Sequence, residues 1–337
     1  MNVKTGIAGL GRLGYIHASN IALRIRQADL VAVCDPNPEL LMKAKKDLGV
    51  NNTFTDYSDM LKNGQMDAVI IVTPTEYHCS QINEAMDAGL HVFCEKPLGT
   101  NLDDCKETVK IVEKHKQQVF MLGYMRRYDE SYLYAKQKIE EGYIGRPVLF
   151  RGYSVDPESS IKSILAFLPK SGGQFNDMAV HDFDLARWFL KSEPKSVYAI
   201  GGCFAHPEFA SYDDGDNVAA LMQFENEAMA FFLAGRTASH GYNIETEIIG
   251  TKATLRIGSV PQKNLVELMD ESGIRKECTR SFPARFAPAF INEIQEFMDC
   301  ILEKRKPGIT AFDGYMASKM AMLATESFRE HKPIQIN

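Results

Sequence analysis

The sequence predicts an α/β Rossmann domain with a doubly wound parallel sheet, followed by an α+β domain with an open, mostly antiparallel sheet. Three observations predict this fold. Short apolar runs alternate with segments of helical periodicity through the first part of the chain. A G-x-G-x-x-G motif follows the first apolar run. Beyond about residue 147 the apolar runs succeed one another with fewer helical segments between them. We place the two domains at 1–124 and 125–337, with the last helices able to pack back on the first domain.

Length and charge restrict the classes of protein to consider. The chain has 337 residues, which is too long for one ordinary domain and suits two. Its net charge is −6 and it has no long basic run, so nucleic acid and anionic membranes are unfavourable partners. We find neither a signal-peptide pattern nor an apolar run of about 18 residues. The seven cysteines are scattered without a Cys-x-x-Cys pair, which indicates reduced thiols in the cytoplasm.

The start of the chain has the pattern of a dinucleotide site. Residues 4–9 predict a buried strand, Gly9–Gly14 form the glycine motif, and helical periodicity follows. A second strand, 30–34, ends at Asp35, which lies 21 residues after Gly14. The glycines permit a tight turn and close approach of a pyrophosphate, the helix start offers N–H groups, and the acid binds ribose hydroxyls. The predicted cofactor residues of this motif are Gly9, Gly11, Arg12, Leu13, Gly14 and Asp35.

The acid also indicates which dinucleotide binds. A carboxylate at Asp35 would repel a 2′-phosphate, and Pro36-Asn37 follow it where an arginine could have held one. NAD is therefore the predicted cofactor. Arg12 lies within the loop and could reach a phosphate, so NADP is less favoured but stays open.

The alternation of strands and helices continues to residue 123. Predicted strands are 67–72, 91–94 and 119–123, and predicted helices are 38–48, 77–88 and 102–116. Three strand ends carry polar groups that should line one rim of the sheet, namely Thr73-Pro74, Glu95-Lys96 and Arg126-Arg127. A lysine at such a rim can hold a hydroxyl or exchange a proton. The alternative is that Lys96 is a solvated surface residue.

Beyond Pro147 the pattern changes to that of an antiparallel sheet. Glu225-Asn226-Glu227 is typical of a hairpin turn between two strands. Two helices, 288–303 and 311–330, close the chain. The predicted strands are 148–155, 196–201, 218–224, 228–234, 242–249, 253–257 and 265–269.

A second candidate site lies in the run 171–188. Asp177 and His181 are four residues apart and share one face of the predicted helix. One interpretation is structural, with an acid near the helix start and a histidine in the core. A metal pair is a second, although a third ligand is not evident. In the third, His181 moves a proton and Asp177 binds or orients a substrate. Oxidation of a secondary alcohol needs such a base, and a lysine and a histidine supply it without metal.

With these motifs in view, the chain resembles the glucose–fructose oxidoreductase and inositol dehydrogenase (Gfo/Idh/MocA) family. The resemblance rests on Gly9–Gly14, Glu95-Lys96-Pro97, the run 123–129 and Gly172–Trp188, and it extends over essentially the whole chain. It is strongest to the inositol 2-dehydrogenase branch, through Met125-Arg126-Arg127-Tyr128-Asp129, Val155-Asp156-Pro157 and Gly241-Tyr242-Asn243. That branch oxidises a ring hydroxyl of an inositol to a ketone with NAD. No metal is implied.

The resemblance implies roles for particular residues. Lys96, Asp177 and His181 would be catalytic, with His181 as the general base. The resemblance adds Thr73, Pro74, His78, Glu95 and Lys96 to the cofactor site. It makes Arg126, Asp156 and Tyr242 substrate contacts. The second domain would bind substrate and form a homotetramer or homodimer through its open sheet.

Some positions depart from the pattern of that branch. His240 stands where members of the branch often have a tyrosine, Asp156 where one subset has an asparagine, and Ser154 where some relatives have a histidine. The resemblance places all three in the substrate pocket. Which inositol is oxidised therefore stays open. The alternatives are an NAD(P)-dependent pyranose dehydrogenase of the same family and a non-catalytic NAD-binding sensor, which should lack Lys96 or His181.

Overall fold

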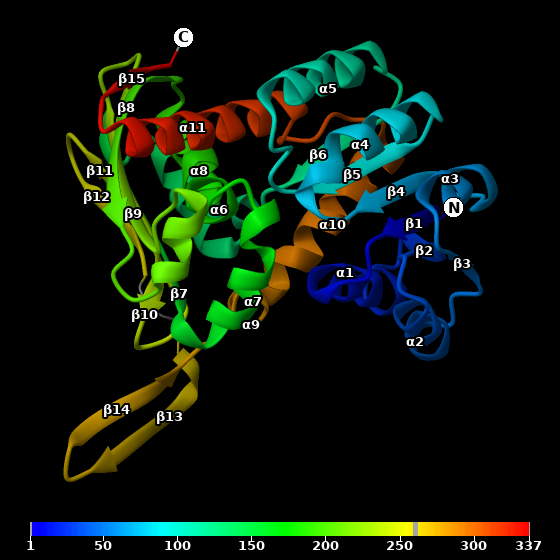
Figure 1. Cartoon of the computed structure of the whole chain (residues 1–337), viewed down its shortest axis with the longest axis horizontal. Helices are drawn as coiled ribbons and strands as arrows, with labels where there is room; N and C mark the ends of the chain where they lie inside the picture. The colour runs from blue at the N-terminus through cyan, green and yellow to red at the C-terminus, as the bar shows by residue number, and fades with distance from the viewer. Residues whose placement is uncertain (1, 259–261, 337) are drawn as a thin grey trace. The chain divides into compact units, whose positions relative to one another are not determined.

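The computed structural model describes residues 2–258 and 262–336. The chain folds into two compact units, and each is described by itself. The first contains the chain up to Tyr128 together with Pro288–Ser318. The second contains Asp129–Ala287 and the chain from Lys319 onward. Figure 1 labels the helices and strands of both units.

Six parallel strands form the sheet of the first unit, in the order β3-β2-β1-β4-β5-β6. The chain order reverses between β1 and β4, which is where open α/β sheets bind ligands at their carboxyl ends. Every residue of β4 and β6 is buried, as in sheets covered on both faces. The predicted doubly wound sheet is therefore confirmed. The strands are β1 Val3–Ala8, β2 Ala28–Cys34, β3 Asn52–Phe54, β4 Ala68–Ile71, β5 His91–Glu95 and β6 Phe120–Gly123.

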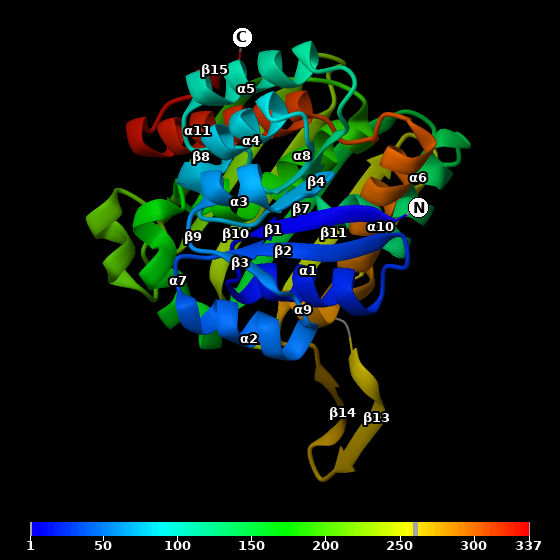
Figure 2. The ribbon, with the colours of Figure 1, turned by 90° about the vertical axis from the view of Figure 1, so that its right-hand side faces the viewer.

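Helices cover both faces of this sheet. One hydrophobic core joins the sheet to α1, α2 and α10, through residues such as Ile21, Leu41 and Phe297. Figure 2 shows α3, α4 and α5 on the opposite side of the sheet from α1 and α2. The helices are α1 Arg12–Leu23, α2 Pro38–Leu48, α3 Tyr57–Asn63, α4 His78–Asp87, α5 Leu102–Lys114 and α10 Ala287–Glu303.

Local sequence determines where these helices begin. The Asn37 side chain accepts a hydrogen bond from Glu39 N at the start of α2, and Pro38 occupies the first helical turn. Asn101 caps α5 in the same way, accepting from Asp103 N and Asp104 N. The predicted helix 102–116 ends two residues early, at Lys114.

Seven strands form the sheet of the second unit, in the order β12-β11-β7-β10-β9-β8-β15. Neighbouring strands are antiparallel, apart from the parallel pair β7 and β10. The mostly antiparallel sheet predicted for this part of the chain is therefore confirmed. The strands are β7 Pro147–Pro157, β8 Pro194–Gly202, β9 Asn217–Phe224, β10 Met229–Ala238, β11 Asn243–Gly250, β12 Thr254–Ile257 and β15 Ile334–Gln335.

The two faces of this sheet differ in what covers them. On one face, α8 (Val180–Leu190) packs against β7, and the N–H of Ala199 donates to the Ser327 hydroxyl on α11 (Ala311–Glu330) at 3.0 Å. On the opposite face, alternate side chains of β8, β9 and β10 are apolar and exposed. We call this surface the open sheet face; its most exposed members are Tyr198, Ile200, Leu221 and Met229.

A separate two-stranded ribbon, formed by β13 (Gln262–Asp270) and β14 (Gly273–Cys278), projects from the second unit in both Figure 1 and Figure 2. The sequence did not predict β14, because its residues Gly273–Cys278 include three consecutive charged residues and show no alternation of apolar and polar side chains. It also did not predict the three-residue strand β3 or the short helices α3, α6 (Glu130–Glu140) and α7 (Ile161–Phe167).

Among the described residues, no helix is both long and apolar enough to cross a membrane. All seven cysteines are free thiols, and five of them are buried.

Candidate functional site

The loop between β1 and α1 carries the glycine motif, and its glycines have different reasons to lack a side chain. Gly9 has φ +90°, and a Cβ there would lie 2.5 Å from the carbonyl oxygen of Val72. At Gly14 a Cβ would lie 1.9 Å from the carbonyl oxygen of Gly9. Gly11 is exposed, and a Cβ there would meet nothing within 4 Å among the described residues. Packing of the loop therefore requires Gly9 and Gly14, whereas Gly11 keeps the start of α1 open to a ligand.

Asp35 lies at the carboxyl end of β2, beside this loop. Its Oδ2 accepts a hydrogen bond from Leu10 N at 2.7 Å, and its Oδ1 accepts from Asn37 N at 2.8 Å. Each carboxylate oxygen can accept a further bond, so ribose hydroxyls can still be recognised here. With Arg12 exposed and Leu13 half-buried in the first turn of α1, these residues fit a dinucleotide.

The rim residues after β4 and β5 are linked through a buried histidine. The ring of His78 contacts the carbonyl oxygens of Pro97 (2.7 Å, from Nδ1) and Thr73 (2.9 Å, from Nε2). Burial lowers the pKa of His78, although both carbonyl groups favour its protonated form. The His78 ring therefore links the segments that follow β4 and β5. Thr73 is half-buried and Pro74 is exposed.

Lys96 follows β5 and is half-buried, as the rim prediction requires. Its backbone N–H donates to Glu95 Oε2 at 3.2 Å. The Glu95 side chain points into the first unit, where its Oε1 lies 2.8 Å from His17 Nε2. Glu95 therefore lies beneath the rim, although we expected it along the cofactor surface. Arg126 is buried within the first unit.

In the second unit, Asp177 and His181 lie where two kinds of helix meet. Residues Phe175–Ala179 form a π-helical turn, and α8 begins at Val180. Such turns are rare and often occur at functional sites. His181 is buried, and the Asp177 side chain keeps 24% of its surface exposed.

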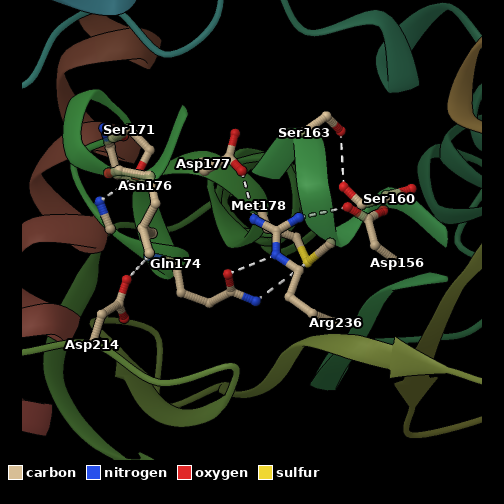
Figure 3. Close-up of polar contacts among 12 residues, drawn as sticks. Asp156, Ser160, Ser163, Ser171, Gln174, Asn176, Asp177, Met178, Asp214 and Arg236 are labelled. Carbon is tan, nitrogen blue, oxygen red and sulfur yellow. Dashed lines mark hydrogen bonds and ion pairs between the residues drawn. The ribbon is translucent and has the colours of Figure 1, made fainter. Parts of the chain in front are cut away.

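The sequence reasoning missed the residue that organises this centre, Arg236 on β10. Figure 3 shows its guanidinium between Asp156 and Asp177. Its terminal nitrogens lie 2.5 Å from Asp156 Oδ2 and 2.5 Å from Asp177 Oδ2. Its Nε donates to Gln174 Oε1 at 2.9 Å, and Gln174 N donates to Asp214 Oδ2 at 2.7 Å. One buried cation thus joins two carboxylates that the sequence assigned to catalysis and to substrate binding.

Charge balance explains the stability of this arrangement. The Arg236 side chain is 3% exposed, so burial disfavours its charge, but Asp177 and Asp156 outweigh that effect and raise its pKa. Asp156 and Asp177 are the more exposed partners, with 18% and 24% of their side-chain surface exposed against 3% for Arg236. No motif spacing in the sequence points to Arg236, because it lies 59 positions from Asp177 along the chain.

Sheet register brings further predicted residues to the same end of this sheet. Asn243, the first residue of β11, pairs with Val155, which places Tyr242 beside the strand end that carries Asp156. Tyr242 is buried and its ring packs at right angles to that of Phe286. His240 is exposed.

Ser154, which the resemblance places in the substrate pocket, lies on β7 where that strand packs against α8. It is fully buried, and its hydroxyl donates to Asp182 Oδ2 at 2.5 Å. Gly152 makes room for that carboxylate, because a Cβ there would lie 2.9 Å from Asp182 Oδ1. Ser154 and Asp182 therefore fasten α8 to β7.

Comparison with known proteins identifies the family and the fold of the chain. Residues 3–124 match the family model described as an oxidoreductase family with an NAD-binding Rossmann fold, and residues 132–256 match the GFO/IDH/MocA C-terminal domain. The chain is 33% identical to the scyllo-inositol 2-dehydrogenase (NAD(+)) of Bacillus subtilis, over 99% of this chain and 96% of the relative. The chain belongs to the Gfo/Idh/MocA oxidoreductase family.

Solved structures of Gfo/Idh/MocA proteins match both units at full length. The scyllo-inositol dehydrogenase of Lactobacillus casei, solved with bound NAD(H) and scyllo-inositol, is 46% identical, with a TM-score of 0.96 over 99% of each chain. The myo-inositol 2-dehydrogenase of Lactobacillus plantarum is 37% identical, with a TM-score of 0.97 over 100% of each chain. The first unit is thus an NAD-binding Rossmann domain, as predicted.

Replacing Arg236 tests whether it holds the polar centre together. We expect Arg236→Leu to lower the free energy of unfolding by about 3 to 5 kcal/mol, because it leaves two carboxylates without their buried cation. The measurement is urea unfolding followed by circular dichroism. Arg256→Leu is the matched control: this arginine of the same sheet also pairs with a carboxylate, Glu245, but is 59% exposed. Its loss should cost less than about 1 kcal/mol. Equal costs for the two variants would contradict the assignment.

The glycine loop gives a second prediction. Gly11→Ala should fold normally, because its Cβ meets no described atom, yet weaken NAD binding by about tenfold or more through contact with the pyrophosphate. Titration calorimetry with NAD measures the affinity, and a thermal melt checks the fold. Gly308→Ala, another exposed glycine with no described atom within 4 Å of a Cβ, is the control and should bind NAD normally. Unchanged NAD affinity in Gly11→Ala would contradict this role.

Proposed function

We propose that this protein is an NAD-dependent inositol dehydrogenase, which oxidises one ring hydroxyl of myo- or scyllo-inositol to the 2-ketone. One observation supports this most strongly. The likeness to the NAD(H)- and scyllo-inositol-bound enzyme of Lactobacillus casei extends over 99% of the chain at 46% identity. The two inositols differ only in the configuration of one ring carbon, so oxidation at that carbon gives the same ketone from both.

The chain's own residues supply the acid–base chemistry of this reaction. His181 takes the proton of the reacting hydroxyl as general base. Lys96 donates a hydrogen bond to that hydroxyl oxygen and shares in the proton relay. Asp177 orients the substrate and polarises His181. NAD, held by Gly11, Arg12, Leu13 and Asp35, would supply the hydride acceptor. The hydroxyl-bearing carbon would lose a hydride to it and the hydroxyl would lose its proton to His181, which leaves a carbonyl group.

Binding contacts divide between the two units. Gly11, Arg12, Leu13 and Asp35 would hold NAD, with Thr73, Pro74 and the other rim residues beside them. Arg126, Asp156 and Tyr242 would contact the polyol. Carboxylates such as those of Asp156 and Asp177 suit a ligand rich in hydroxyl donors, because they accept such hydrogen bonds strongly.

A pyranose dehydrogenase is the second candidate. His240 and Asp156 depart from the pattern that we expect in the inositol branch, and both are near the end of the sheet that carries Tyr242. A pyranose and an inositol present similar rings of equatorial hydroxyl groups. Only a substrate comparison separates the two. All seven cysteines being free thiols supports a reducing, cytoplasmic location as part of this proposal.

The test is NAD reduction, followed by absorbance, with a panel of myo-, scyllo- and chiro-inositol, glucose, xylose and galactose. We expect turnover with an inositol, and Lys96→Met should lower kcat by about a thousandfold while leaving NAD binding intact. Lys4→Met, at an exposed lysine of β1, is the control and should retain full rate. Turnover with a pyranose alone would favour the second candidate. NAD binding without turnover on any substrate would favour the sensor.

We further propose that the protein is an oligomer of identical chains, a homotetramer or homodimer, paired through the open sheet face. The apolar side chains of this face are contiguous, because Leu221 pairs with Tyr198 on one side and with Phe231 on the other. Alternate residues of these strands form the buried core, so the exposed set is a second apolar surface of the same sheet. A second copy of the chain offers the same surface and would cover it.

Leu221→Glu tests the oligomer. Leu221 is 56% exposed, so the variant should fold, but a carboxylate at the centre of an apolar interface should dissociate the assembly. Light scattering coupled to gel filtration measures the mass. Met42→Glu, at a residue of α2 that is 63% exposed, is the control and should keep the wild-type mass. A monomeric wild-type protein would contradict the proposal.

A further inference from the structure

A cluster of three titratable side chains is buried in the first unit, apart from the glycine loop. His17 comes from α1, Glu95 from the end of β5 and Glu293 from α10, and all three are buried. His17 Nε2 lies 2.8 Å from Glu95 Oε1 and 3.9 Å from Glu293 Oε1. The rings of Phe93 and Phe290 contact the imidazole, so little polar surface surrounds the cluster.

Glu293 is the unusual member of this cluster. It has no exposed surface, and neither of its carboxyl oxygens makes a hydrogen bond within the described part of the chain. An ionised carboxylate in such a place is very unfavourable. Burial and the neighbouring charge of Glu95 raise the pKa of Glu293 well above its usual value.

The groups that face Glu293 do not offset this charge. From α1 the group near Glu293 is His17, at 3.9 Å, which is already in hydrogen-bond contact with Glu95. From β5 the facing group is Glu95 itself, and from the segment after β6 it is the buried phenol of Tyr128. Burial raises the pKa of Tyr128, and the Glu296 carboxylate raises it further, so the phenol is neutral. Burial therefore favours the protonated form of Glu293.

Glu95 connects the cluster to the rim. While Oε1 contacts His17, Oε2 accepts the backbone N–H of Lys96. On its other side the carboxyl packs against Gly123, where a Cβ would lie 3.1 Å from Oε2. The Glu95 side chain therefore has a hydrogen-bond contact at each carboxyl oxygen and packs against Gly123 of β6. These contacts hold it in one orientation.

We propose that His17, Glu95 and Glu293 form a positioning cluster for Lys96, in which the contact between His17 and Glu95 holds the carboxyl that accepts the Lys96 N–H. This contact fixes Glu95 as the acceptor for the Lys96 N–H, and thereby fixes the main chain from which the Lys96 side chain projects. The role in the reaction rests on the proposed function, in which Lys96 contacts the reacting hydroxyl. The charge state of the cluster does not depend on it.

Glu293→Gln tests the charge state without an activity assay. A carboxyl whose pKa is raised on folding stabilises the fold fully only below its unfolded pKa, about 4.3, and this contribution is lost as pH rises. Glutamine has the same shape and does not titrate. The unfolding equilibrium constant of the wild type, relative to that of Glu293→Gln, should therefore rise between pH 5 and 8, by up to about tenfold per pH unit. A ratio that stays constant with pH would overturn the neutral Glu293.

His17→Phe tests the positioning role. Phenylalanine fills a similar space between Phe93 and Phe290 but removes the ring nitrogen that contacts Glu95 Oε1. We expect kcat to fall by about tenfold or more, with the NAD dissociation constant within about threefold of wild type. His17→Gln, whose amide can donate to Glu95, should restore kcat to within about threefold. Wild-type kcat in His17→Phe, or an NAD affinity that falls in parallel with kcat, would overturn positioning of Lys96.

Two further measurements distinguish failure of the cluster proposal from failure of the proposed function. The ligand atoms of the three side chains lie within 4.8 Å of one another, so metal content must be measured in the purified protein. One equivalent of a divalent metal that is lost in Glu293→Gln would overturn the proton-based account. If the wild type oxidises no polyol, the proposed function fails, whereas the pH dependence of Glu293→Gln still decides the charge state.

Discussion

The polar centre of the second unit depends on the ion pairs that the buried guanidinium of Arg236 makes with Asp156 and Asp177. The guanidinium joins the end of β7, the π-helical turn before α8 and, through Gln174, the segment around Asp214. A buried cation is stable only with partners, and here two carboxylates from different elements supply them. The geometry of Asp156 and Asp177 is consequently not set by either side chain alone, because each is held against the same planar fork.

Each unit places a buried basic side chain near two carboxyl groups. In the second unit an arginine is placed between two carboxylates, and in the first a histidine contacts one carboxylate while another lies 3.9 Å away. In each unit the basic residue, Arg236 or His17, is at least as buried as the carboxylates that it faces. Such an arrangement lets polar groups keep fixed orientations without relying on bulk water, which is a requirement for a site that transfers a hydride.

The sequence predicted those features that depend on local pattern. The glycine motif, Asp35 and the strand ends follow from spacing along the chain, and the structure has them where the pattern indicated. Arg236, His17 and Glu293 escaped because each acts through partners that are distant in sequence; Glu293 is 276 positions from His17 and 198 from Glu95. Helical periodicity places Glu293 on the apolar face of α10, three residues after Phe290 and four before Phe297, but it cannot show that His17 and Glu95 lie beside it. The contact between Ser154 and Asp182 likewise depends on which face of β7 meets α8, and period alone does not determine that face.

Gly123 and Gly152 share a property that ordinary rules for glycine do not cover. Neither has a left-handed backbone, yet a Cβ at either would press on a buried carboxylate, that of Glu95 or that of Asp182. At Gly123 a Cβ would also lie 2.9 Å from the ring of Phe93. In a laboratory or natural lineage, alanine could therefore enter at Gly152 only after Asp182 had shortened or moved, and at Gly123 only after both Phe93 and Glu95 had given way. The order in which such substitutions accumulate is constrained, with the facing side chains changing first.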